Sequence, residues 1–166
     1  MELNASAFSV DGYLISQKQT ENLPFGACNS RQTGCGWIAA YNLLHATLHP
    51  IGWDQVRRDL SRRLLFEGTE GLHLFTLVEY LREQGCRMKF SCTLTGSRLL
   101  ADECKAGILM YGTKTSSHYV AFISQKNGTL RFLNAGEGRE DVTMTLRDFY
   151  REVISFPIFC MIAAYS

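Results

Sequence analysis

The 166-residue sequence has no large excess of charge of either sign, little proline and no long hydrophobic run. Its 17 Lys and Arg residues nearly balance its 16 Asp and Glu residues, so no global field would recruit nucleic acid or an anionic membrane. Residues 1–16 lack the basic region and the continuous apolar region of a signal peptide. No apolar run approaches the length of a membrane span. We therefore expect a cytoplasmic location, no nucleic-acid partner and no membrane span.

Internal repeats, low-complexity tracts and Pro/Gly-rich linkers are also missing, which predicts one domain over residues 1–166 with its own core. There are six cysteines. Without a signal peptide, in a chain of this size, we expect free thiols rather than a disulfide framework. Four of them fall among apolar neighbours in expected strands or helices and are predicted to be inert packing residues: Cys86, Cys92, Cys104 and Cys160.

The first half of the chain has helical patterns. Residues 36–48 are apolar on almost every side, which predicts a helix buried all round and closed by Pro50. Residues 53–65 predict an amphipathic helix, with the arginine-rich run 57–63 on its solvated face. Residues 72–84 predict a third helix, for which Gly85 is the expected C-terminal cap.

After Gly85 the patterns become short strands. We expect strands at 87–94, 107–112, 118–125, 129–135 and 156–165, with short helices at 97–104 and 146–153. The strands are joined too closely for repeated crossover helices. The sequence therefore predicts the α+β class, with N-terminal helices packed on a C-terminal antiparallel sheet.

Cys35 stands between Gly34 and Gly36 at the point where the buried helix begins. Unpaired N–H groups and the macrodipole at a helix N-terminus favour thiolate over thiol. The two glycines are interpreted as leaving room for a substrate backbone, and the Cys35 amide could donate to an oxyanion. On position alone, a thiol that packs under its own helix is an equal alternative.

A nucleophilic thiol needs a base, and His118 is the candidate because it stands at the mouth of an apolar strand. His45 and His49 lie in or at the end of the buried helix, beyond reach of its first residue, and His73 is expected at the surface or in the first turn of a helix. The sequence separations between Cys28, Cys35, His45 and His49 do not match the spacing of zinc-finger ligands, so no bound metal is expected.

Loop geometry decides whether Asn134 can reach His118. A two-residue turn at 127–128 would point Asn134 away from the histidine. A three-residue loop over 126–128, with Gly128 left-handed, places Asn134 as its diagonal neighbour on the same face. We expect the three-residue loop, and with it a hydrogen bond between the Asn134 and His118 side chains.

The segments TGCGWIAAYNLL, SSHYVAF and FLNAG together resemble the papain-like cysteine peptidases, most of all their bacterial C39-like, bacteriocin-leader-processing branch. The resemblance spans about residues 29–136. It implies a papain-like fold, a peptide or protein substrate and no cofactor. It also implies Cys35 as nucleophile, His118 as general base and then acid, and Asn134 as the group that orients the imidazole.

One position departs from the family pattern. The oxyanion glutamine usually lies about six residues before the cysteine, where this chain has Asn29, while Gln32 lies only three before. Either amide could complete the oxyanion hole. These peptidases are also commonly fused to a transporter, for which the sequence has no segment.

Two other functions use the same residues. One is an acyl-transfer enzyme, such as a transglutaminase, acyltransferase or deamidase, and the other is a catalytically inactive papain-like module that binds a peptide. Transglutaminases and arylamine acyltransferases usually have aspartate where Asn134 stands, which favours the peptidase.

Overall fold

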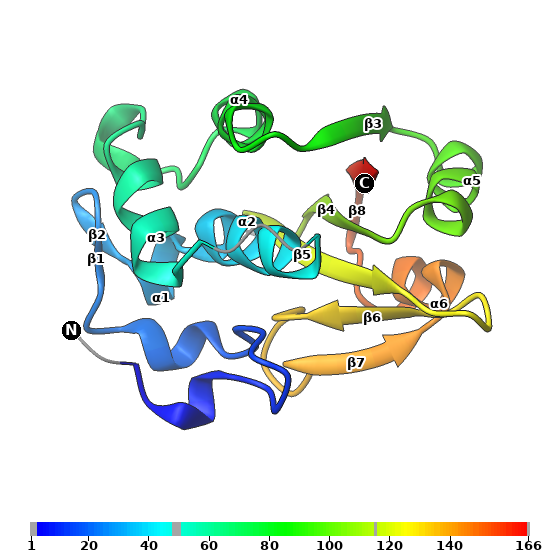
Figure 1. Cartoon of the computed structure of the whole chain (residues 1–166), viewed down its shortest axis with the longest axis horizontal. Coiled ribbons are helices and arrows are strands. Elements are labelled where there is room, and N and C mark those ends of the chain that lie inside the picture. The colour runs from blue at the N-terminus through cyan, green and yellow to red at the C-terminus, as the bar shows by residue number, and fades with distance from the viewer. Residues whose placement is uncertain (1–2, 48–50, 115, 166) are drawn as a thin grey trace.

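A computed structural model describes residues 3–47, 51–114 and 116–165, and shows helices from the first half of the chain against an antiparallel sheet from the second half (Figure 1). The helices are α1 (Ser30–Thr33), α2 (Cys35–Ala46), α3 (Trp53–Ser61), α4 (Leu74–Glu83), α5 (Leu94–Glu103) and α6 (Leu146–Glu152), with 3-10 turns η1 (Ala5–Ala7), η2 (Gln17–Thr20) and η3 (Phe66–Gly68). The strands are β1 (Pro24–Phe25), β2 (Cys28–Asn29), β3 (Arg87–Ser91), β4 (Ala106–Gly112), β5 (Ser117–Ser124), β6 (Leu130–Leu133), β7 (Asp141–Met144) and β8 (Phe156–Tyr165).

The main sheet has the order β3-β8-β4-β5-β6-β7, and every neighbouring pair is antiparallel. The last strand, β8, lies between β3 and β4 and is therefore an interior strand of the sheet. This arrangement confirms the expected α+β class. The residue pattern predicted neither β7 nor the separate β1–β2 hairpin, because strands of four and two residues are too short to show an alternating pattern.

Side chains alternate between the two faces of the sheet and form two apolar cores. On one face, Tyr119, Ala121 and Ile162 pack against α2, α3 and α4. On the other, Val120, Phe122 and Met161 pack against residues of α5 and α6. The buried helix α2 lies across the first face (Figure 1), which brings its N-terminus to the end of β5 where His118 is located.

Some predicted boundaries are wrong. The expected end of the α2 helix at Leu48 and its closure by Pro50 fall outside the described residues. Helix α3 ends at Ser61 rather than Leu65, and β3 ends at Ser91. The chain leaves the sheet there because the Thr93 side chain caps α5 by accepting a hydrogen bond from the Gly96 amide.

The arginine-rich run is not wholly a solvated face. Arg57 is only 9% exposed, and its guanidinium donates to the Asp54 carboxylate and, at 2.6 Å, to the carbonyl of Pro24. The other arginines of the run keep to the surface, where Arg63 pairs with Glu83. Arg57 lies four residues after Trp53 and three before Leu60, so a helical wheel places it at the border of the apolar stripe, where it can be buried. The β1 residue Pro24 offers it a carbonyl that only the tertiary fold brings near.

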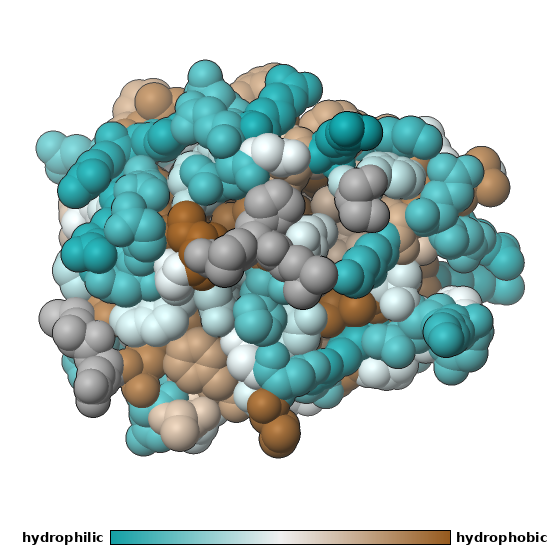
Figure 2. Space-filling view, in the orientation of Figure 1, coloured by the Kyte–Doolittle hydropathy of each residue, from teal (hydrophilic) through white to brown (hydrophobic). Residues whose placement is uncertain are grey.

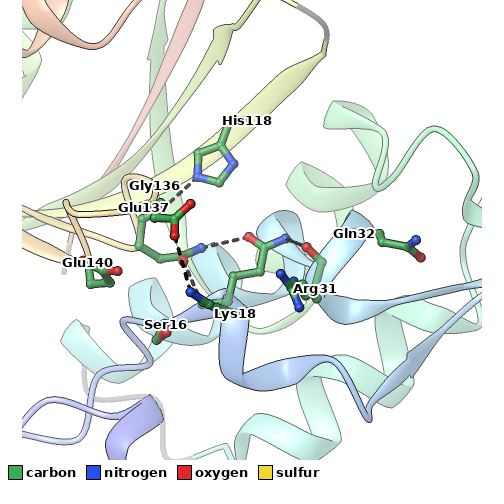
Figure 3. Close-up of a pocket in the computed structure, with 10 residues that line it drawn as sticks. Ser16, Lys18, Arg31, Gln32, His118, Gly136, Glu137 and Glu140 are labelled. Atoms are coloured by element: carbon green, nitrogen blue, oxygen red, sulfur yellow. Dashed lines mark hydrogen bonds and ion pairs between the residues drawn. The ribbon is translucent and has the colours of Figure 1, made fainter.

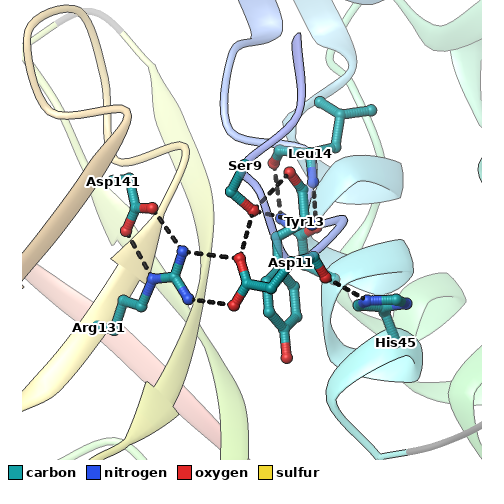
Figure 4. Close-up of polar contacts among 8 residues, drawn as sticks. Ser9, Asp11, Tyr13, Leu14, His45, Arg131 and Asp141 are labelled. Carbon is teal, nitrogen blue, oxygen red and sulfur yellow. Dashed lines mark hydrogen bonds and ion pairs between the residues drawn. The ribbon is translucent and has the colours of Figure 1, made fainter. Parts of the chain in front are cut away.

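The N-terminal segment is fastened to α2 and to the sheet by polar contacts (Figure 4). The buried Asn42 side chain bonds both the amide and the carbonyl of Leu14, each at 2.8 Å. The His45 ring bonds the main-chain oxygen of Asp11 at 2.9 Å. Arg131 of β6 pairs with the carboxylates of both Asp11 and Asp141. Residues 11–14 are thereby held between helix and sheet, and the chain continues from them toward His118.

The face seen in Figure 2 is largely hydrophilic, with hydrophobic residues in separate spots. Among the described residues, no helix is both long enough and apolar enough to cross a membrane.

Candidate active site

Cys35 is the first residue of α2, which begins one residue before the predicted start at Gly36. The short helix α1 precedes it and is closed at its start by a capping box, in which Asn29 and Gln32 each bond the other's main-chain amide. Gly34 then links the two helices. The Cys35 side chain is partly exposed at this junction, and the main-chain amides of Gly36 and Tyr119 lie next to it.

Gly34 and Gly36 do not open space for a substrate, contrary to the expectation. A Cβ on Gly34 would lie 2.3 Å from the Ser30 carbonyl oxygen and 2.7 Å from the Trp37 ring nitrogen. A Cβ on Gly36 would lie 2.8 Å from the Leu72 side chain. Both positions need glycine because the protein itself packs there. The two glycines let α1 and Leu72 approach the helix end closely and so fix the position of the thiol.

The three-residue loop is confirmed. The amide of Gln125 donates to the Thr129 carbonyl at 2.9 Å, and Gly128 has a φ of 77°. This sets the β5–β6 register, in which Ala121 lies opposite Leu133. Counting back along that register brings His118 and Asn134 together, as predicted.

The contact between these two residues differs from the expected one. The His118 Nε2 bonds the main-chain oxygen of Asn134 at 2.8 Å. The Asn134 side chain turns away and forms two bonds with Gln17, one from the Gln17 amide to Oδ1 at 3.0 Å and one from Nδ2 to the Gln17 side-chain oxygen at 3.1 Å. Asn134 has a φ of 63°, and this left-handed backbone directs its carbonyl at the ring. The predicted side-chain hydrogen bond is therefore wrong, although the pairing of the residues is right.

A carbonyl oxygen only accepts, so Nε2 carries the proton and Nδ1 is the ring nitrogen left for Cys35. Tyr111, opposite His118 on β4, supports the ring edge-on at 5.6 Å between centroids. Its hydroxyl donates to the Ala135 carbonyl at 3.2 Å. The imidazole is thus held on two sides. Tyr111 was missed by sequence reasoning because an apolar strand pattern does not distinguish it from an ordinary core residue.

The electrostatics favour an ion pair. Burial alone would raise the pKa of the Cys35 thiol, but the hydrogen bond to His118, the charge of His118 and the amides of Tyr119 and Gly36 outweigh it and lower that pKa. Burial would likewise lower the pKa of His118, yet the hydrogen bond and charge of Cys35, with the Asn134 carbonyl, raise it. Both shifts stabilise a thiolate beside an imidazolium.

Of the two oxyanion candidates, Gln32 is the one that lines the cavities beside both Cys35 and His118. Its side-chain oxygen accepts from the Asn29 amide at 3.3 Å, which leaves its NH₂ group as a donor. The side-chain oxygen of Asn29 accepts from the Gln32 amide, so that oxygen serves the start of α1. Spacing along the chain favours Asn29, and the cavity favours Gln32.

A polar cavity of about 310 Å³ opens on the His118 side of the site (Figure 3). Ser16, Gln17 and Lys18 line it from the N-terminal segment, and Glu137 faces them from the loop after β6. Lys18 and Glu137 form an exposed ion pair at 3.4 Å. The role of the N-terminal residues gave no signal in the sequence, because they reach the site through long-range contacts such as the bond between Gln17 and Asn134.

On the Cys35 side lies a smaller cavity of about 190 Å³, bounded by Gln32, Thr33 and Tyr119. It adjoins an apolar groove of about 470 Å³. The groove is lined by Leu65, Phe66, Leu72, Leu74, Phe75 and Met110. Phe66 and Phe75 are 80% and 76% exposed, so the groove presents two large apolar side chains to solvent.

The other histidines in the described residues do not join this site: His73 caps α4 and His45 holds the N-terminal segment, while His49 lies outside the description. Over residues 3–47, 51–114 and 116–165, no group of three or more His, Cys, Asp or Glu side chains is placed to hold a metal ion.

A buried helix with cysteine at its N-terminus, packed on an antiparallel sheet that supplies the histidine, is the arrangement of papain-like peptidases. The chain has the fold of the C39 peptidase domains within that class. It superposes on a double-glycine-motif protease from an AMS/PCAT transporter, in complex with its leader peptide, with a TM-score of 0.53 and 17% identity, covering 80% of this chain and 84% of that one.

Two further likenesses are to the peptidase domain of Streptococcus ComA, described as a bifunctional ABC transporter of a quorum-sensing pathway. One structure gives a TM-score of 0.54 and 15% identity, covering 79% of this chain and 91% of that one. The other is a complex of the Streptococcus mutans ComA peptidase domain with a small-molecule inhibitor. It gives a TM-score of 0.51 and 15% identity, covering 81% of this chain and 93% of that one. No protein-family model and no curated protein matches the sequence.

Proposed function

We propose that the protein is a cysteine peptidase in which Cys35 attacks the carbonyl of a peptide bond. The observation that carries the proposal is the contact of His118 with both the Cys35 thiol and the Asn134 carbonyl. A helix-end thiol with a fixed base is the arrangement that nucleophilic catalysis requires. The structural likeness to peptidase domains supports this assignment.

His118 has two roles. In the resting ion pair it holds the proton of the Cys35 thiol, and after attack it gives that proton to the departing amine. A water molecule then loses a proton to His118 and releases the acyl group from the sulfur. The Asn134 carbonyl keeps Nε2 protonated throughout, so Nδ1 is the atom that exchanges the proton. In this proposal the Cys35 amide and the Gln32 NH₂ group donate to the oxyanion.

The two sides of the site receive different parts of the substrate. The departing amine must lie near His118, so the residues after the cleaved bond occupy the polar cavity beside Lys18 and Glu137. The acyl part must lie on the Cys35 side, in the small cavity and then the apolar groove of Phe66 and Phe75. The proposed substrate is a peptide with apolar residues before the cleaved bond and polar residues after it. The bound leader peptide of the similar protease supports a peptide substrate.

The test is cleavage of an amine-blocked peptide library, made from digested bacterial protein, with new N-termini read by mass spectrometry. We expect cleavage by the wild-type chain and acylation of Cys35 in acid-quenched samples. Both should be lost in Cys35→Ser and His118→Ala. Cys28→Ser is the matched control, since Cys28 is also a partly exposed thiol but lies outside the site.

The other outcomes are equally definite. Acyl groups that pass to an added amine in preference to water would indicate an acyltransferase. If the folded chain shows no cleavage and no acylation of Cys35, the peptidase proposal is overturned in favour of a binding module.

A further inference from the structure

A pair of cysteines lies away from the site, one directly after the end of β3 and the other on β8. The two strands pair with Ser91 opposite Met161. The next step of the same register places Cys92 opposite Cys160, so the two side chains are neighbours on the same face of the sheet. Cys92 is exposed, whereas Cys160 is 7% exposed. The expectation that Cys92 is an inert packing residue is therefore wrong.

We propose that Cys92 and Cys160 form a reversible intramolecular disulfide, which joins the edge strand β3 to β8. The proposal does not depend on the proposed peptidase function.

The geometry suits such a bond. Residues directly opposite on antiparallel strands have Cβ atoms about 4.5–5.5 Å apart, and a disulfide needs about 3.5–4.5 Å. The remaining adjustment can come from Cys92, because it lies just beyond the last residue of β3, where the chain turns toward α5. The edge position of β3 also leaves that end of the strand paired on one side only.

The different exposure of the two thiols sets the order of reaction. Burial, together with the neighbouring Cys92 thiol, raises the pKa of Cys160. The oxidant therefore meets Cys92 first, and Cys160 acts as the resolving thiol once a mixed disulfide is formed.

With a low-molecular-weight disulfide such as oxidised glutathione as oxidant, the reaction balances. The Cys92 thiolate attacks one sulfur of the oxidant, so a Cys92–glutathione bond forms, the oxidant's S–S bond breaks and one thiol leaves. The Cys160 thiol then gives up its proton and attacks the Cys92 sulfur, releasing the second thiol. Two protein thiols are oxidised and one small disulfide is reduced to two thiols.

The bond would form close to the groove. Cys160 lies opposite Met110 on β4, and Met110 lies opposite Tyr119 on β5. Met110 and Tyr119 both line the apolar groove next to Cys35. Cys160 would thus lie one strand away from Met110 in the wall of the groove.

The test is equilibration of the full chain in glutathione buffers of graded ratio, followed by alkylation, trypsin digestion and mass spectrometry. Trypsin places Cys92 in the peptide 90–98 and Cys160 in the peptide 152–166, with no other cysteine in either. We expect these two peptides to appear linked under oxidising ratios and to separate on reduction. Alkylation of Cys92 should fall about tenfold or more when the bond forms.

Two variants serve as controls. Cys92→Ser changes an exposed residue, so the chain should fold, and it should leave Cys160 unlinked. Cys104→Ser removes a buried cysteine that bonds Ser124 instead, and it should leave the link unchanged. Adducts of Cys35 are read on a separate peptide. A Cys92 that is glutathionylated without linking to Cys160, that links between chains, or that stays alkylated in every buffer would overturn the proposal.

Discussion

The His118 ring donates from Nε2 to the main-chain oxygen of Asn134, while the Asn134 side chain bonds Gln17. Asn134, the residue that follows β6, therefore orients the imidazole through its main-chain carbonyl and not through its side-chain amide. Its side chain instead ties the N-terminal segment to the sheet. Gln17 in turn donates to the carbonyl of Arg31 at 2.9 Å, which links the same segment to the short helix before Cys35.

Asn134→Gly tests this relationship. Glycine accepts the left-handed backbone and keeps the carbonyl, so we expect Cys35 alkylation by iodoacetamide at pH 7 to fall by less than about tenfold. His118→Ala should abolish the enhanced reactivity. A loss in Asn134→Gly as large as in His118→Ala would show that the side chain, not the carbonyl, orients the ring.

The ion pair predicts a pH profile. The pKa of Cys35 is lowered from its ordinary value of 9.0, so the alkylation rate should rise with pH below the range of a free thiol. The pKa of His118 is raised from 6.5, so peptide hydrolysis, which needs its proton, should fall only as the pH passes that raised value. We expect a bell-shaped profile for kcat/KM between the two. In His118→Ala the alkylation rise should move to higher pH, and an unmoved profile would contradict the pair.

We expect Gln32 to act as an oxyanion donor and Asn29 to act as a helix cap. Gln32→Glu keeps the oxygen that accepts from the Asn29 amide but loses the NH₂ donor, so acylation should slow by about 10²–10³-fold with little loss of stability. Asn29→Ala removes a cap and should cost about 1 kcal/mol of stability. Acylation rates and urea unfolding measure the two effects. The reverse pattern would make Asn29 the oxyanion residue.

The N-terminal segment should loosen in acid. The hydrogen bond from Arg131 is the main cause that lowers the pKa of Asp11 from 3.8 to about 2. The stability that the ionised Asp11 carboxylate gains from Arg131 is therefore fully present above about pH 4, and it is lost as the pH falls toward 2. The protection factor of the Leu14 amide, measured relative to the intrinsic exchange rate at each pH, should fall over that range. In Asp11→Asn it should already be low at neutral pH, and equal protection in both proteins would contradict the anchoring role.

Gly34→Ala should destabilise the chain by about 1–3 kcal/mol, because the new methyl group meets the Ser30 carbonyl, which cannot move freely. Gly36→Ala should cost less, since its neighbour is the movable Leu72 side chain. Gly52→Ala is the control, with open space at its Cβ and an expected cost below about 1 kcal/mol. Urea unfolding gives all three values. Equal effects at Gly34 and Gly52 would remove the packing explanation.

The sequence by itself determined the features that depend on neighbouring residues. A helix begins at Cys35, a three-residue loop ends in left-handed Gly128, and that loop sets the register that brings His118 to Asn134. Helices followed by closely joined strands likewise define the α+β class. These features follow from local hydrogen bonding and periodicity, which the order of residues specifies directly.

Only the tertiary structure decided which atoms meet. Asn134 turns its carbonyl to His118 because Gln17, 117 residues away in sequence, takes the side chain. Gly34 is packed against its own chain, and Cys92 faces Cys160 because β8 enters the sheet beside β3. Such contacts depend on packing between distant segments, and no local pattern records them.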